Sequence, residues 1–178
     1  MKDSDGKMYC YSTSEPYYAN RIFPLFDQPN LKNSFTLSVN APEDWTIISN
    51  EARTGELDKQ PDKTVTWKFA PTPRLSTYLY CICAGPFLEI KCEDPLEGIP
   101  MSHFVRASLL NHLKVQGKEI FEMTKKSIRF YENLFGYNFP FSKYDYVYCP
   151  EYNMGAMENP GCITINDAYV FKGDISLS

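Results

Sequence analysis

The sequence lacks the features that mark membrane-spanning, secreted and nucleic-acid-binding proteins. No apolar run is long enough to cross a bilayer, and the polar opening Met1–Lys7 is followed by no apolar core of a signal peptide. No Asn-x-Ser/Thr acceptor for N-glycosylation occurs. The 18 basic and 22 acidic residues give a net charge of −4 and form no basic cluster, which argues against a nucleic-acid partner.

Cysteine pairs of the kind that bind metals or form redox centres are also missing. None of the six cysteines belongs to a Cys-x-x-Cys pair, and Cys81 and Cys83 lie two residues apart in an apolar run. Alternate residues of a strand share a face but are poorly placed for a local disulfide, so we expect reduced, mostly buried thiols. With the polar opening of the chain, this favours a cytoplasmic location.

What the sequence does contain is enough apolar material for a sizeable core. The chain has 178 residues, of which 43% are hydrophobic and 15% aromatic, so it suits one large or two small domains. The many Tyr and Phe residues are typical of β-rich packing.

The first half predicts an antiparallel β domain over residues 1–91. Apolar and polar residues alternate over 33–40, and similar strand patterns occur over 45–49 and 64–69. A long apolar run over 76–90 is broken at a Gly-Pro pair. Several short strands separated by turns indicate an antiparallel sandwich or a saddle-like sheet.

The second half has a different pattern and predicts the beginning of an α+β domain. Residues 92–100 contain two prolines, a glycine and three acidic residues, and we interpret them as a connector. The domain that follows, residues 101–178, contains a helical pattern and then strands over Tyr144–Cys149 and Cys162–Ile165.

The helical pattern of this second domain is strongest between residues 118 and 135. Apolar residues recur there at steps of three and four, with charged residues on much of the other face. Gly136 is expected to end the helix. Gly117 is expected to separate it from an earlier short helix, Ala107–Val115.

One stretch, Glu151–Gly161, is unusual because small residues precede a single carboxylate. Gly155 and Ala156 allow another chain to lie close to the backbone, and Glu158 follows them before a sharp Asn-Pro-Gly turn. One interpretation is an edge strand with Met154 and Met157 in the core and a solvated Glu158. The other is a recognition edge, at which the backbone pairs with an extended peptide and the carboxylate meets a cation.

Three segments together resemble one known family. Gly155 to Asn159 is identical to the G-A-M-E-N exopeptidase motif of the zinc aminopeptidases related to aminopeptidase N, a gluzincin family. Glu15 to Pro29 is similar to the family's E-P-x-x-A-R-x-x-F-P-C-F-D-x-P segment, and Phe135 to Asp145 to its F-G-x-x-x-P-F-x-K-Y-D run. The resemblance covers nearly the whole chain. It implies that residues 1–91 are a partial amino-terminal β domain of aminopeptidase N type and that residues 101–178 are the first part of a thermolysin-like catalytic domain.

The resemblance also implies roles for particular residues in binding a peptide with a free amino terminus. Glu158 and Glu15 would contact the α-ammonium group, because a charge-assisted hydrogen bond anchors that cation and rejects internal peptides. The remaining residues assigned to substrate binding are those of the motif and its approach: Met154, Gly155, Ala156, Met157 and Asn159. Gly155 and Ala156 would hold the peptide as an added strand, and Met154 would contact its first side chain.

The sequence contains no ligand set for catalytic zinc. The family binds zinc through an H-E-x-x-H helix, but here only His103 and His112 occur, nine residues apart, and we interpret both as surface or helix-end histidines. Zinc is therefore expected in the full-length family member, whereas this chain, as a fragment without that helix, is expected to bind none and to be inactive alone.

Two other functions remain open. A relative of the family that kept the recognition edge and lost the metal-binding half would be a non-catalytic peptide-binding or scaffold protein. An epoxide-opening relative of the leukotriene hydrolases is the second alternative, although Ala156, where those proteins have Gly, favours the general aminopeptidase.

Overall fold

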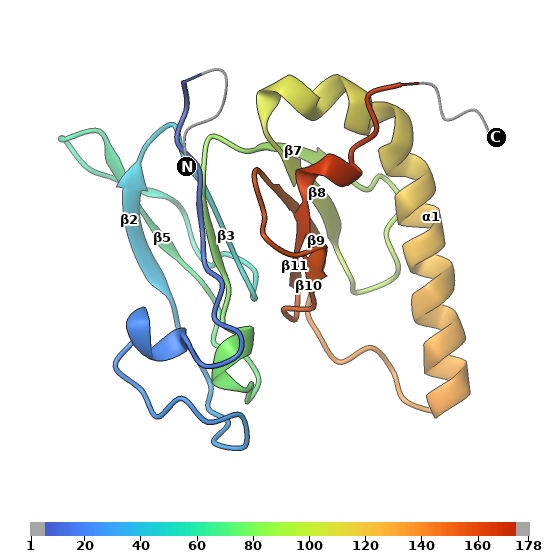
Figure 1. The fold of residues 1–178 in the computed structure, drawn as a ribbon, viewed down its shortest axis with the longest axis horizontal. Coiled ribbons are helices and arrows are strands. Elements are labelled where there is room, and N and C mark those ends of the chain that lie inside the picture. Colours follow the sequence, from blue (N-terminus) through green and yellow to red (C-terminus); the bar gives the residue numbers. More distant parts are fainter. Residues whose placement is uncertain (1–5, 174–178) are drawn as a thin grey trace. The chain divides into compact units, whose positions relative to one another are not determined.

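The computed structural model describes residues 6–173, and the contacts of the chain divide it into two compact units (Figure 1). The first unit comprises Met1–Pro86 and Glu158–Cys162, and the second comprises Phe87–Met157 and Ile163–Ser178. The domain limits expected from the sequence, at residues 91 and 101, stay predictions.

The first unit contains two three-stranded antiparallel sheets. One has the order β1 (Cys10–Tyr11), β6 (Ile82–Gly85), β3 (Thr46–Ser49). The other has the order β2 (Ser38–Pro42), β5 (Thr64–Lys68), β4 (Asp58–Lys59). Two short 3-10 helices, η1 (Ala19–Arg21) and η2 (Thr77–Leu79), lie in the connections. Side chains from both sheets form a shared core: Leu37, Ala41, Ile47, Phe69 and Ala84. This is the predicted antiparallel β domain.

The first predicted strand is shorter than its sequence pattern suggested. The alternation begins at residue 33, whereas β2 begins at Ser38. Phe35 instead pairs with Thr72, whose hydroxyl accepts a hydrogen bond from the Phe35 N–H at 2.9 Å. Pro71 and Pro73 flank Thr72 and have no N–H to donate, so a regular ladder cannot form along this stretch.

The second unit contains a five-stranded sheet with the order β10, β11, β9, β8, β7. These strands are β7 (Leu88–Lys91), β8 (Met101–Val105), β9 (Tyr144–Cys149), β10 (Ala156–Met157) and β11 (Cys162–Asn166). β8 and β9 are parallel, so the chain must return to the starting end of the sheet between them. The helix α1 (Leu110–Phe135) provides this crossover. The α+β class and the strand over Tyr144–Cys149 are confirmed.

The predicted break at Gly117 is wrong, because α1 runs through this residue as one helix of 26 residues. The short 3-10 helix η3 (Ala107–Leu109) precedes it. Gly117 serves close packing: a Cβ built there would lie 3.2 Å from Cδ2 of His103 on β8. Gly136 ends the helix as predicted, in the left-handed conformation with φ of 60°.

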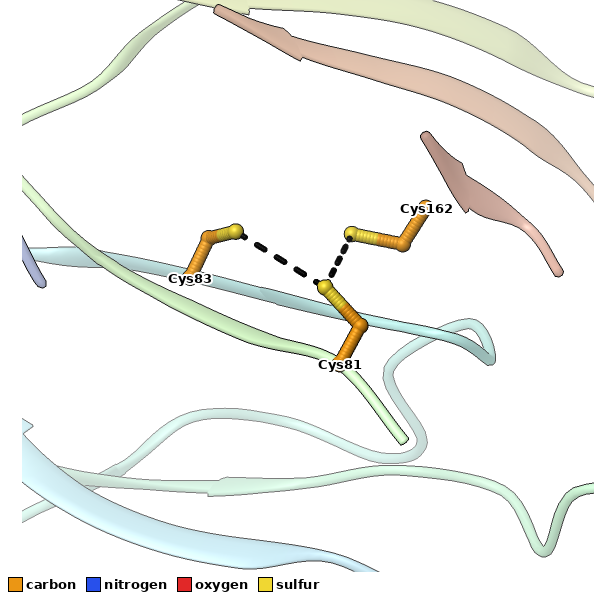
Figure 2. Close-up of side chains that lie close together, drawn as sticks. All are labelled: Cys81, Cys83 and Cys162. Atoms are coloured by element: carbon orange, nitrogen blue, oxygen red, sulfur yellow. Dashed lines mark hydrogen bonds between the residues drawn. The ribbon is translucent and has the colours of Figure 1, made fainter. Parts of the chain in front are cut away.

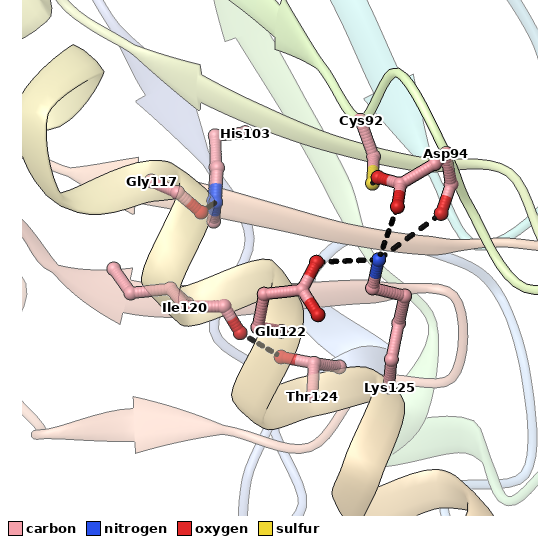
Figure 3. Close-up of polar contacts among 8 residues, drawn as sticks. All are labelled: Cys92, Asp94, His103, Gly117, Ile120, Glu122, Thr124 and Lys125. Carbon is pink, nitrogen blue, oxygen red and sulfur yellow. Dashed lines mark hydrogen bonds and ion pairs between the residues drawn. The ribbon is translucent and has the colours of Figure 1, made fainter.

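His103 is not the surface histidine that we expected. It is fully buried on β8, and its Nε2 lies 3.2 Å from the carbonyl oxygen of Gly117 (Figure 3). Its ring stacks on Phe121 and Tyr146, with centroid distances of 4.0 and 5.2 Å. Burial lowers the pKa of His103 to about 4, because the protonated ring would lose its hydration. His112 lies half-buried on α1.

Lys125 on α1 binds the expected connector, residues 92–100, through Asp94. Nζ of Lys125 donates to the carbonyl oxygen of Asp94 at 3.1 Å and to its carboxylate at 3.0 Å (Figure 3). The same ammonium group pairs with Glu122 at 2.6 Å.

No helix within residues 6–173 is both long enough and apolar enough to cross a membrane.

The buried His103 predicts that the chain loses stability in mild acid. Its folded-state pKa lies below the ordinary value of 6.5, so the unfolded chain binds the proton more tightly. The stabilisation is complete above about pH 6.5 and is lost as the pH falls toward about 4. We expect His103→Gln to remove about 2 kcal/mol of the difference in unfolding free energy between about pH 7 and about pH 5.

Urea unfolding at the two pH values measures this difference. His112→Gln is the matched control, since it removes the other histidine and leaves the buried ring in place. An unchanged pH dependence in His103→Gln would show that another group is responsible.

Candidate functional site

The stretch singled out in the sequence forms an edge of the five-stranded sheet. After β9 the chain turns at Glu151, which has a positive φ of 50°, and then reaches β10. β10 is antiparallel to β11, with Ala156 opposite Ile165 and Met157 opposite Thr164. Within residues 6–173 β10 is the last strand on this side of the sheet. Its outer side can therefore accept a further strand.

Side chains from β11 fix the approach to this edge. The backbone N–H of Asn166 donates to the carbonyl oxygen of Gly155 at 2.9 Å, and its Nδ2 donates to the carbonyl oxygen of Tyr152 at 2.7 Å. The hydroxyl groups of Tyr152 and Thr164 lie 2.8 Å apart. These contacts hold the residues before β10 in place without using its outer side.

The backbone direction at Ala156 follows from these contacts. The carbonyl of Gly155 points toward β11, and peptide groups alternate along a strand. The N–H and C=O of Ala156 therefore point away from β11, toward the open edge. Ala156 is exposed, whereas Met157 is 6% exposed and Met154 is half-buried. Met157 thus fits the core position that one interpretation gave it, and Ala156 fits an open edge.

Gly155 lies beside an aromatic residue that the sequence gave no reason to select. A Cβ built on Gly155 would lie 3.2 Å from the hydroxyl oxygen of Tyr169. A surface pocket next to β10 is lined by residues from two stretches of the chain, including Met154, Gly155, Asn166, Ala168, Tyr169 and Phe171. A larger residue at position 155 would press against the phenol that borders this pocket.

Glu158 and the turn after it follow β10 directly in the chain. The side chain of Glu158 is exposed, and Asn159 is buried. The N–H of Cys162 donates to the carbonyl oxygen of Asn159 at 3.0 Å, which closes the turn. Gly161 has a φ of 71°, a conformation that favours glycine. The sharp turn expected at Asn-Pro-Gly is present.

Asn50 anchors this turn, and sequence reasoning missed it. Its Nδ2 donates to the carbonyl oxygens of Pro160 and Leu79, both at 2.9 Å, and its Oδ1 accepts from the N–H of Cys81 at 2.9 Å. The side chain is 2% exposed. One buried amide thus ties together three backbone segments that are far apart in the sequence. An asparagine after a strand ordinarily indicates a turn, so no pattern distinguished it.

Glu15 and Glu158, the two carboxylates expected to bind a peptide amino group, are both exposed. Within the described part of the chain neither side chain has an ion pair or a hydrogen bond. Both can therefore meet a cation from outside the chain. Their roles, like those of the motif residues, stay predictions.

The segment from Phe135 to Asp145, which also carried the resemblance, contains a buried ion pair. Nζ of Lys143 lies 2.7 Å from Oδ2 of Asp145, and both side chains are buried. Burial raises the pKa of Asp145 from its ordinary value, and the adjacent ammonium group opposes this change. The pair sits at the start of β9, the strand that leads to the candidate site.

The described residues do not fit a catalytic zinc centre. Within residues 6–173, one group of three side chains has ligand atoms close enough to hold a metal, and it consists of Cys81, Cys83 and Cys162. Neither histidine belongs to this group, and the ring of His103 is enclosed by aromatic residues. No step of zinc chemistry can be built from these residues.

Comparison with known proteins identifies two family models along the chain. Residues 1–79 match the Peptidase M1 N-terminal domain, and residues 119–176 match the Peptidase family M1 domain. Aminopeptidase N of Streptomyces lividans is 38% identical over 174 residues, which cover 97% of this chain and 19% of that protein. Probable aminopeptidase 2 of Sulfurisphaera tokodaii is 33% identical over 162 residues, covering 91% of this chain and 20% of that protein.

A mammalian protein is similar over the same range. Aminopeptidase N of Oryctolagus cuniculus is 30% identical over 170 residues, which cover 94% of this chain and 17% of that protein. The chain therefore spans about a fifth of the length of the curated relatives it matches.

The contacts of Asn50 predict that Asn50→Ala loosens the turn after β10. Two carbonyl oxygens and one N–H would lose their buried partner, so we expect a loss of about 2–3 kcal/mol in unfolding free energy. We also expect faster hydrogen exchange at the N–H of Cys162. Asn153→Ala is the matched control, since Asn153 is exposed, and should cost less than about 0.5 kcal/mol. Equal effects of the two substitutions would contradict the anchoring role.

Proposed function

The chain belongs to peptidase family M1, and we propose that it is the part of a zinc aminopeptidase that recognises the amino terminus of a peptide. One observation carries the proposal. The two-residue edge strand β10 presents the backbone of Ala156 outward, and the exposed carboxylate of Glu158 follows in the chain. An extended peptide needs such an edge, and its α-ammonium group needs such a carboxylate.

Recognition at this edge uses two kinds of contact. Backbone hydrogen bonds to Ala156 fix the direction of the peptide and do not depend on its side chains. The carboxylate of Glu158 then selects the charged amino end, because an internal peptide bond offers no cation and leaves the carboxylate poorly satisfied. Glu15 is proposed to share this contact. Met154, in the pocket wall, is proposed to contact the first side chain.

We further propose that zinc and the hydrolytic groups are supplied by sequence outside this chain. The relatives are named aminopeptidases, and the chain matches about a fifth of their length. An apolar groove along α1 supports this proposal, because water-exposed apolar residues that lie side by side can mark a contact surface. Met123, Tyr131 and Phe135 line this groove together with residues of the loop that follows the helix, and all three are exposed.

A non-catalytic peptide-binding protein is the second candidate. The observation that favours it is that the proposed recognition edge lies within residues 6–173, whereas those residues hold no zinc ligand set of the family type. The names of the relatives support the aminopeptidase over the epoxide-opening alternative.

Binding of a short peptide to the 178-residue chain tests recognition of the amino terminus. We expect a free amino terminus to bind at least about tenfold more tightly than the same peptide acetylated, since a charge-assisted hydrogen bond contributes about 1.5–3 kcal/mol. Glu158→Gln should reduce this preference by a similar factor. Titration followed by changes in the amide NMR spectrum gives both affinities.

Glu56→Gln is the matched control, because Glu56 is also exposed and lies far from the motif in sequence. It should leave the preference unchanged. A peptide that binds equally well with and without its acetyl group would rule out amino-terminal recognition and leave a general peptide-binding surface.

The chain alone is expected to lack hydrolytic activity. With no zinc ligand set of the family type among residues 6–173, we expect no release of product from an aminoacyl chromogenic substrate above the rate in buffer. Hydrolysis that appears with the purified chain and disappears with a chelator would contradict this expectation.

A further inference from the structure

Three cysteine side chains converge on one point inside the first unit (Figure 2). The sulfur of Cys81 lies 3.5 Å from that of Cys162 and 3.9 Å from that of Cys83. All three sulfurs lie within 4.8 Å of one another. Each of the three residues is 0% exposed. This cluster plays no part in the recognition of a peptide proposed above.

The backbone around the cluster is held firmly, so the three sulfurs are preorganised. The Ser49 hydroxyl donates to the carbonyl oxygen of Cys81 at 2.7 Å, and the N–H of Cys81 donates to Asn50. Cys83 lies on β6 and shares a strand face with Cys81, since alternate residues point the same way. Cys162 begins β11, just after the turn that Asn50 anchors. Little rearrangement is needed for all three thiols to bind one atom.

The spacing and burial of the sulfurs restrict what that atom can be. Zinc in a structural site takes four ligands, and the group holds no fourth histidine, cysteine or carboxylate within the described residues. A monovalent ion such as Cu(I), held by three thiolates, would leave a net charge of −2 in a site that water does not reach, which is costly. A trivalent centre held by three thiolates is neutral. Burial therefore favours a thiophilic trivalent element.

We propose that Cys81, Cys83 and Cys162 form a binding site for trivalent arsenic, taken up as arsenous acid. Each of the three thiols loses its proton and forms one As–S bond, and each of the three hydroxyl groups on arsenic leaves as water with that proton. No electron is transferred, so no oxidant or reductant is required. The product links β6 covalently to the start of β11 through one arsenic atom.

The test uses the 178-residue chain incubated with arsenite in the presence of a phosphine reductant, because a dithiol would compete for arsenic. Intact-mass analysis measures the number of arsenic atoms, and a thiol reagent added after unfolding counts the remaining thiols under conditions that retain bound arsenic. We expect one arsenic atom per chain and the loss of three of the six thiols. X-ray absorption at the arsenic edge should give three sulfur neighbours and no oxygen.

Variants identify which thiols are used. Cys83→Ser and Cys162→Ser should each weaken arsenite binding at least about tenfold, since one As–S bond is lost. Cys149→Ser is the matched control, because Cys149 is also fully buried but belongs to the second unit, and it should bind as the unchanged chain does.

Several results would overturn the proposal. They are oxygen neighbours around arsenic in the unchanged chain, the loss of two thiols instead of three, equal binding by Cys83→Ser, and one Cu(I) ion bound more tightly than arsenite. The absorption measurement needs no variant, so the proposal stays testable even if a cysteine substitution prevents folding.

Discussion

The close contact between Gly117 and His103 is the constraint on which the second unit depends. With no side chain at this point, α1 approaches β8 until its backbone carbonyl oxygen lies 3.2 Å from the imidazole ring. This contact packs α1 closely against β8, the strand that precedes it. Because β8 and β9 are parallel, the chain has to cross back over the sheet through this helix before β9 can form. The position of β9 in turn determines where the chain emerges into Glu151 and β10.

The same contact explains why part of the fold could be predicted from sequence and part could not. The strands over 64–68 and 144–149 have clear patterns, and Gly136 is a strong stop signal, so local chemistry was sufficient there. Gly117 is also a glycine next to an apolar periodic stretch, so from sequence alone it looks like a helix end, as Gly136 does. Its role is instead decided by tertiary packing. A sequence read alone cannot show that His103 lies opposite it, and for that reason both residues were misinterpreted.

The candidate site shows a similar division. Small residues, a carboxylate and a turn within one stretch made the motif visible, and β10 lies at the edge of the sheet, as both interpretations of this stretch expected. The residues that hold the stretch in place are distant in sequence and unremarkable in type. Asn50 lies more than a hundred positions before the turn that it anchors, and Asn166 belongs to the neighbouring strand. Long-range hydrogen bonds by single polar side chains leave no periodic signal in a sequence.

The length of β10 also has a kinetic consequence. Only Ala156 presents its backbone outward, so a peptide added at this edge gains few hydrogen bonds there. Each such bond contributes about 0.5–1.5 kcal/mol, and a short ladder cannot hold a ligand for long. Affinity changes of this kind are expressed mainly in dissociation rates. A peptide bound here would have a brief residence time. After it dissociates, the edge is free to bind the amino terminus of another peptide.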